Sequence, residues 1–227
     1  MEVIRLPQIF SLEYWIGKLL TLPAILLAIS MHEFAHGFVS AKLGDPTPRA
    51  MGRLSFNPLA HIDWVGAFCL FFFGFGWAKP VQIDTRYYKR KKLGIILVSL
   101  VGVVMNFILA FLLMIVWALI IRFISPLVPG TEGAIRAYNI IYAMIYYGVT
   151  INIGLGVFNL LPIPPLDGSK VLFAVLPNKY YNFILKYERY GMIILVLLLF
   201  TDVLPYIMTP CSNFIYHLFA QVASLIL

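Results

Sequence analysis

From Leu93 to Ile121 the sequence carries no Asp, Glu, Lys, Arg or His, and most of its residues are Leu, Ile, Val and Phe. A helix needs about 20 predominantly apolar residues to cross the hydrocarbon core of a bilayer, so this run predicts a transmembrane helix. The whole chain agrees, because 61% of its 227 residues are hydrophobic and only 12% are charged. A soluble domain is about half apolar and about a quarter charged, so we predict an all-α polytopic membrane protein.

Four further apolar segments are expected to be helical, namely residues 22–41, 135–158, 190–204 and 213–227. Pro205 and Pro210 fall between the last two and are expected to form the turn that separates them, because proline interrupts a helix. Residues 6–20 either lie along the membrane interface or extend the first helix. The pattern therefore predicts about five to six transmembrane helices in a single domain, residues 1–227.

One apolar segment, residues 64–77, is too short to cross a bilayer. It fits a re-entrant segment or β-hairpin that follows the first core helix and is buried in protein. The two flanking loops, 42–63 and 79–92, would then share one side of the membrane, and they hold more than half of the 17 Lys and Arg residues. The positive-inside rule places that side in the cytoplasm. Because the basic residues lie beside apolar runs, the net charge of +7 indicates a lipid bilayer as partner and no nucleic acid.

This topology brings two polar clusters to the same membrane depth. His32, Glu33 and His36 form an HExxH pattern in the second half of the first span, and Asp167 follows the third span on the same side. Residues four apart share one face of a helix, so the two imidazoles can hold one zinc ion. Glu33 is placed beside them to take a proton from a zinc-bound water and return it to the leaving amide nitrogen.

A catalytic zinc keeps one position open and needs a third protein ligand. Asp167 is the favoured ligand because it follows a span end on the His36 side and comes shortly after Pro164 and Pro165, which turn the backbone. The other carboxylates in or near apolar segments are Asp63, Asp84 and Asp202. The Asp167 side chain could instead cap the helix that begins at Gly168, and His61 is an alternative ligand. We predict one zinc ion per chain, held by His32, His36 and Asp167.

Asn159 lies at the end of the third span, where a buried amide needs hydrogen-bond partners. It could bind the substrate carbonyl or stabilise the oxyanion as a catalytic residue, or it could bond a neighbouring helix. For Asn106 and Asn152 we expect bonding between helices. A transmembrane substrate hides its peptide bonds within its own helix, so it must be unwound, and an exposed strand edge near residues 52–56 or 74–81 could pair with it.

Taken together, these motifs resemble the site-2 protease family of intramembrane zinc metalloproteases. His32-Glu33-Phe34-Ala35-His36 is similar to the family's zinc motif, and Asn159 to Gly168 is similar to its second motif, with Asp167 as the third ligand. Two intervening stretches are also similar, residues 52–63 and 76–81. The resemblance covers most of the chain. It implies a multi-pass protein of a prokaryotic cell membrane, active toward the cytoplasm, that cleaves membrane-tethered transcriptional regulators or anti-sigma factors.

Two departures from the family pattern stand out. Val103 replaces the proline of the motif that ends at Asn106, from which we expect altered packing without lost catalysis. The chain also has no room for a PDZ or CBS domain, so it looks like a minimal catalytic core. One rival interpretation is a catalytically inactive metal-binding or scaffold protein, which would not need the base Glu33. Another is a transporter, which would spread its polar residues through several spans.

Overall fold

The computed structural model describes residues 11–73, 76–177 and 190–227, and within these ranges every regular element is a helix. Three stretches are long and apolar enough to cross a membrane, Tyr14–Lys42, Lys91–Leu127 and Glu132–Leu160. A fourth span is formed if helix Tyr190–Leu199 and helix α9 (Val203–Ala223) cross together, with an 81° bend between them. The expected all-α multi-pass protein is therefore confirmed, while the count of five to six spans remains a prediction.

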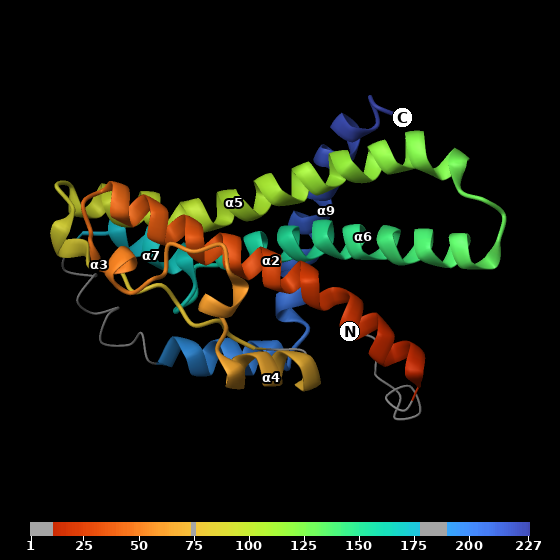
Figure 1. Cartoon of the computed structure of the whole chain (residues 1–227). Helices are drawn as coiled ribbons and strands as arrows, with labels where there is room; N and C mark the ends of the chain where they lie inside the picture. The colour runs from red at the N-terminus through yellow and green to blue at the C-terminus, as the bar shows by residue number, and fades with distance from the viewer. Residues whose placement is uncertain (1–10, 74–75, 178–189) are drawn as a thin grey trace.

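The core is built from α5 (Lys91–Leu119) and α6 (Glu132–Leu160), which run side by side in Figure 1. Alanines, valines and other apolar side chains fill the contact between them and reach α9, including Ala110, Met114, Val149, Ile153 and Ala223. Helix α2 (Leu12–Lys42) packs against both helices, and its small residues Ala28 and Ala35 are buried. Small residues allow close approach of helix backbones in membranes, which brings the HExxH residues against α5.

Helix α2 begins earlier than the apolar pattern indicates. Ser11 is its N-cap, with the Ser11 hydroxyl accepting a hydrogen bond from the backbone N–H of Tyr14 at 3.2 Å. Of the two alternatives for residues 6–20, the described part therefore extends the first helix, and residues 6–10 lie outside the described ranges.

The segment expected to be re-entrant contains helix α4 (Trp64–Phe73). Its two flanks meet, because Ile62 and Ala78 form a single antiparallel bridge and the N–H of Lys79 donates to the carbonyl of His61 at 2.9 Å. The described residues thus form a helix here with one bridge at its base. The β-hairpin alternative and the re-entrant placement remain predictions.

The turn expected at Pro205 and Pro210 lies elsewhere. The break between the last two helices falls at residues 200–202, and both prolines lie within α9. Pro205 is in the first turn of that helix, where the missing N–H would have no intrahelical partner anyway. Pro210 lies inside the helix, so proline alone did not locate the boundary.

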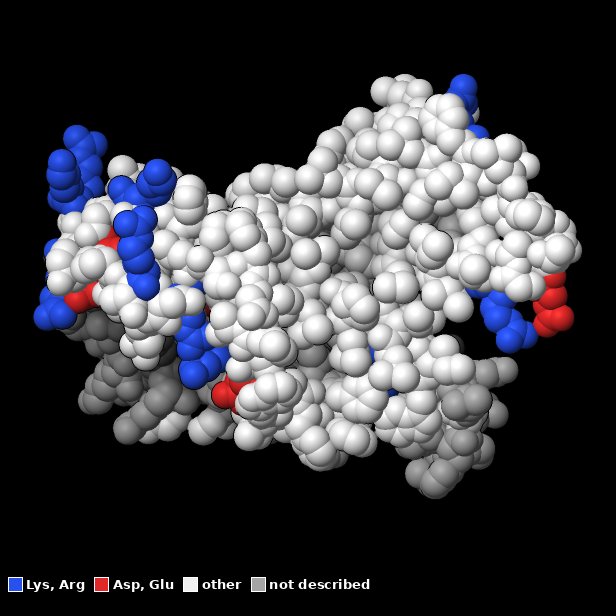
Figure 2. Space-filling view, in the orientation of Figure 1, with Lys and Arg blue, Asp and Glu red and all other residues white. Residues whose placement is uncertain are grey.

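Charged side chains gather at the two ends of the molecule, as Figure 2 shows. Most of the Lys and Arg residues in the described ranges lie at the end where α2 finishes, around α3 (Thr47–Ala50) and the start of α5, while Arg122, Glu132 and Arg136 lie at the other end. On the face that Figure 2 shows, the described surface between the two ends carries few charges. Such a belt is typical of a protein that crosses a bilayer with its polar ends in water.

Candidate metal centre

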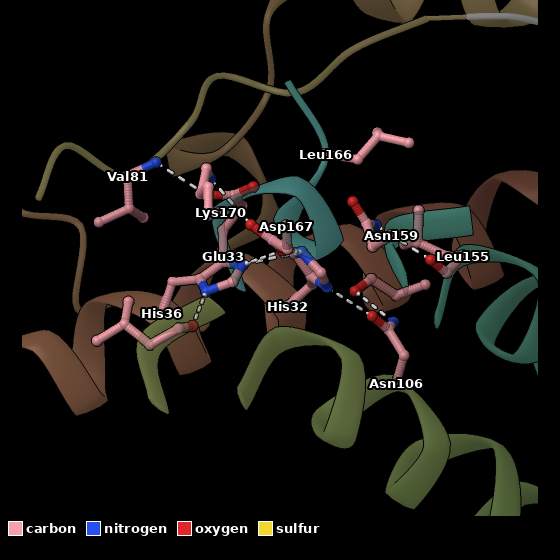
Figure 3. Close-up of polar contacts among 12 residues, drawn as sticks. His32, Glu33, His36, Val81, Asn106, Leu155, Asn159, Leu166, Asp167 and Lys170 are labelled. Atoms are coloured by element: carbon pink, nitrogen blue, oxygen red, sulfur yellow. Dashed lines mark hydrogen bonds and ion pairs between the residues drawn. The ribbon is translucent and has the colours of Figure 1, made fainter. Parts of the chain in front are cut away.

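His32 and His36 lie one turn apart on α2, and both imidazoles point toward the carboxylate of Asp167, the first residue of α7 (Asp167–Val175). Figure 3 shows the three side chains converging. Oδ2 of Asp167 lies 3.1 Å from Nε2 of His32 and 2.9 Å from Nε2 of His36, and the two Nε2 atoms are 2.9 Å apart. All three residues are buried. The structure therefore brings together the three residues that the sequence predicts as metal ligands.

Helix α5 fixes the orientation of both imidazoles. Nδ1 of His32 lies 2.6 Å from Oδ1 of Asn106, and Nδ1 of His36 lies 2.6 Å from the carbonyl oxygen of Val98. Both partners are acceptors, so each Nδ1 carries the proton and each Nε2 keeps a lone pair toward Asp167. Supporting acceptors of this kind set the tautomer of metal-binding histidines.

The Asn106 side chain is itself fixed by two neighbouring helices. Its Nδ2 donates to the carbonyl of Ala28 at 3.2 Å and to Oδ1 of Asn152 at 3.0 Å, while Nδ2 of Asn152 donates to the carbonyl of Gly148 at 2.8 Å. These bonds leave Oδ1 of Asn106 as the acceptor that faces His32. The expectation of bonding between helices holds for both asparagines, but it missed the role of Asn106 in holding an imidazole.

Gly102 gives the two imidazoles the space that they occupy against α5. A Cβ atom at this position would lie 2.5 Å from Nε2 of His36 and 2.6 Å from Cε1 of His32. Only a residue without a side chain fits there, which explains the glycine of the motif that ends at Asn106.

The side chain of Asp167 does not cap α7. Leu166 is the N-cap residue and makes no side-chain capping bond, so the capping alternative for Asp167 is not what the structure adopts. The second oxygen, Oδ1, accepts a hydrogen bond from Nζ of Lys170 at 2.9 Å. His61 lies apart from this group, and its Nε2 is bonded to the carbonyl of Ser55 at 2.9 Å.

Glu33 and Asn159 flank the histidine pair. Oε2 of Glu33 accepts a hydrogen bond from the backbone N–H of Val81 at 2.8 Å, which ties α2 to the segment after α4. Nδ2 of Asn159 donates to the carbonyl of Leu155 in its own helix at 3.0 Å. An amide carries two N–H groups, so this bond leaves one donor for another partner.

The donor set fits a zinc ion. Two imidazoles and one carboxylate are the ligands of many catalytic zinc sites, which keep a fourth position open. Zinc bonds of about 2.0–2.2 Å in a tetrahedral arrangement hold ligand atoms roughly 3.3 Å apart. The observed separations of 2.9 and 3.1 Å need to widen by only a few tenths of an ångström. Among the described residues, this is the one group of His, Cys, Asp and Glu close enough to hold a metal.

Fold and site together define a helical membrane protein in which two histidines and one carboxylate could hold a metal ion, with a glutamate next in sequence to the first histidine. The model of peptidase family M50 matches residues 20–201. The chain therefore belongs to peptidase family M50, the site-2 protease family of zinc metalloendopeptidases.

Two relatives support this assignment, and both are named as candidate zinc metalloproteases. YwhC of Bacillus subtilis is 32% identical over 189 residues, covering 83% of this chain and 84% of YwhC. Rip2 of Mycolicibacterium smegmatis is 27% identical over 192 residues, covering 82% of this chain and 68% of Rip2. No solved structure matches the chain significantly.

Proposed function

We propose that this protein is an intramembrane zinc endopeptidase that hydrolyses a peptide bond within or near a transmembrane segment of a membrane-tethered protein. The observation that carries the proposal is the convergence of His32, His36 and Asp167, buried at one end of a helical bundle. These three side chains would hold one zinc ion per chain. Zinc would supply a Lewis acid that polarises the scissile carbonyl and makes a water molecule acidic enough to react near neutral pH.

Glu33 is the proposed general base. It follows His32 directly on α2, and within the described part of the chain its carboxylate accepts one hydrogen bond, from the backbone N–H of Val81. A carboxylate has further lone pairs, so Glu33 can still accept a proton from water and pass it to the leaving amide nitrogen. Asn159 is the proposed donor to the substrate carbonyl or the oxyanion, through the N–H that its bond to Leu155 leaves available.

The segment 76–81 is the proposed strand edge for an unwound substrate. Its backbone pairs with residues 61–62 through the Ile62–Ala78 bridge and then contacts Glu33 through Val81, so it runs from the base of α4 to the catalytic base. An extended peptide bound beside it would lie next to Glu33. Substitution of Pro80 is expected to impair cleavage of an intact transmembrane helix more than cleavage of one already broken by proline. Equal effects on both substrates would contradict this role.

We also propose how the protein lies in the membrane. We place the protein in a prokaryotic cell membrane, with residues 64–77 re-entrant, about five to six spans in one domain, and the metal centre toward the cytoplasm. The support is the gathering of Lys and Arg at the end that holds α7. The natural substrate would then be a transcriptional regulator or anti-sigma factor whose membrane segment reaches that depth.

The test is proteolysis by the purified full-length protein in liposomes that contain a transmembrane reporter peptide. Cleavage should stop when a chelator removes the metal and should return on addition of zinc. Cleavage that persists without metal would contradict the proposal. The alternative, a catalytically inactive metal-binding homologue, predicts zinc binding without cleavage of any membrane segment.

A further inference from the structure

The two oxygens of the Asp167 carboxylate have different partners. Oδ2 faces Nε2 of His32 and of His36, whereas Oδ1 accepts a hydrogen bond from the ammonium group of Lys170, one turn further along α7. Asp167 is buried, but the Lys170 side chain is 48% exposed and reaches inward from the surface. In the sequence, Lys170 is one of several basic residues between the third span and residue 190. Only the structure shows that its side chain bonds Asp167.

We propose that Lys170 is a positioning residue of the metal centre, an inference that rests on the proposed zinc ligands. By occupying Oδ1, it fixes the rotation of the carboxylate and directs Oδ2 toward the two histidines. Asp167 would then bind zinc through one oxygen and leave the remaining position of the metal open for reaction. Without Lys170, the carboxylate could rotate and offer both oxygens to the metal or neither.

Two effects of Lys170 on zinc affinity oppose each other. Its positive charge repels a cation, while its hydrogen bond orients a ligand. The Lys170 side chain is about half exposed, so solvent and salt screen the repulsion. The bond is made to a buried carboxylate oxygen, and a buried charged group without its partner is costly. The orienting effect should therefore dominate.

Lys170→Met tests this balance, because methionine keeps the apolar stem and removes the ammonium group. Loss of a supporting partner of a metal ligand typically weakens metal binding by about 10–100-fold, and we expect a loss in that range. Lys170→Arg keeps a cationic donor and should bind zinc nearly as well as the wild type. Lys89→Met is the matched control, since it removes an exposed charge at the same end of the molecule and should leave zinc affinity unchanged.

The measurement is competition for zinc between the full-length protein in detergent and a chromophoric chelator. Thermal unfolding of the zinc-free variants shows whether each is folded. A second comparison, in an Asp167→Asn background, should show that Lys170→Met has little further effect, because the pair acts through one carboxylate.

Wild-type zinc affinity in Lys170→Met would overturn the inference. Equal losses of zinc affinity in Lys170→Met and Lys170→Arg would also overturn it. So would a loss caused by Lys170→Met in the Asp167→Asn background as large as the loss in the wild-type background. The proposed ligand set fails separately, if His32→Ala or Asp167→Ala retains full zinc affinity. The two failures are therefore distinguishable.

Discussion

At the residue scale, the metal centre depends on side chains that bind no metal themselves. Two of its three proposed ligands could be found from HExxH spacing, and Asp167 from the end of a span on the same side. Asn106 could not be found in this way. Its bond to His32 depends on how α2 and α5 are rotated and shifted along their axes relative to each other. The spacing of residues within one helix does not determine how two helices are aligned.

Asn106→Leu should weaken zinc binding by about 10–100-fold, because it removes the acceptor that orients His32. It also leaves the buried Nδ1–H of His32 and Oδ1 of Asn152 without a partner, so the protein should unfold at a lower temperature. Chelator competition and thermal unfolding check the two effects. Wild-type zinc affinity in a folded Asn106→Leu protein would rule out this role.

Gly102→Ala should disrupt the same group of side chains by steric clash, without removing a hydrogen-bonding group. Its methyl group would collide with both imidazoles, so we expect loss of zinc binding and of proteolysis. Gly154→Ala is the control, because a Cβ at that position in α6 meets no atom within 4 Å. Metal content and cleavage should be normal in Gly154→Ala. A Gly102→Ala protein with full metal content would show that the imidazoles can move aside.

At the element scale, sequence located the cores of the long helices and misplaced some of their ends. Ser11 starts α2 before the apolar run begins, since a cap depends on one hydroxyl and its hydrogen bond. The last two helices separate at residues 200–202, before both prolines. The first turn of α9 tolerates Pro205, and Pro210 lies inside the helix without ending it. The ends of these helices therefore depend on local backbone and capping interactions that a hydrophobic pattern does not contain.

Asp45 forms the joint between the end of α2 and the segment before α5. Its carboxylate accepts hydrogen bonds from the Ser40 hydroxyl and from the N–H groups of Thr47 and Asp84, and the Tyr88 hydroxyl bonds Ser40. Burial alone would raise the pKa of Asp45, but the bonds from Thr47, Asp84 and Ser40 outweigh it and lower that pKa. The joint is thus held by the charged form of Asp45.

Asp45→Asn should lower thermal stability at pH 7, because each hydrogen bond to a charged group contributes about 1.5–3 kcal/mol. Because folding lowers the pKa of Asp45, its carboxylate stabilises the fold fully at pH values above the ordinary pKa of 3.8. This stabilisation is lost as the pH falls below 3.8 and through the lower pKa of the folded state. The gap between wild type and variant should therefore narrow in acid. A gap that stays constant from pH 7 to pH 3 would contradict the linkage to Asp45.

At the scale of the whole molecule, the charge distribution predicts that the two ends lie on opposite sides of the membrane. Cys69 and Cys211 are the two native cysteines, so a variant without them can carry single reporters. Lys89→Cys should be shielded from an impermeant maleimide in intact cells and react after lysis, while Gly133→Cys should react in intact cells. The reverse pattern would invert the topology and move the metal centre to the outer face.

The overall arrangement could be predicted because hydrophobic runs and basic loops together limit how a short chain can cross a bilayer. That logic predicts that Asp167 lies at the same membrane depth as His36, and the structure has Asp167 in contact with both histidines. The bent pair formed by Tyr190–Leu199 and α9 could not be anticipated in the same way. Helix α9 packs against α6, and hydropathy encodes neither that contact nor the 81° angle between the two helices of the pair.

The central claim, that this metal centre cleaves membrane segments with Glu33 as base, is tested most directly by comparing wild type with Glu33→Gln. Both proteins are reconstituted with a transmembrane peptide that the wild type cleaves, and the bound zinc is measured in each. Glu33→Gln keeps the shape of the side chain and all three proposed ligands, so it should retain one zinc per chain and lose cleavage. Equal cleavage by the two proteins, or a wild type that cleaves without bound zinc, would contradict the account.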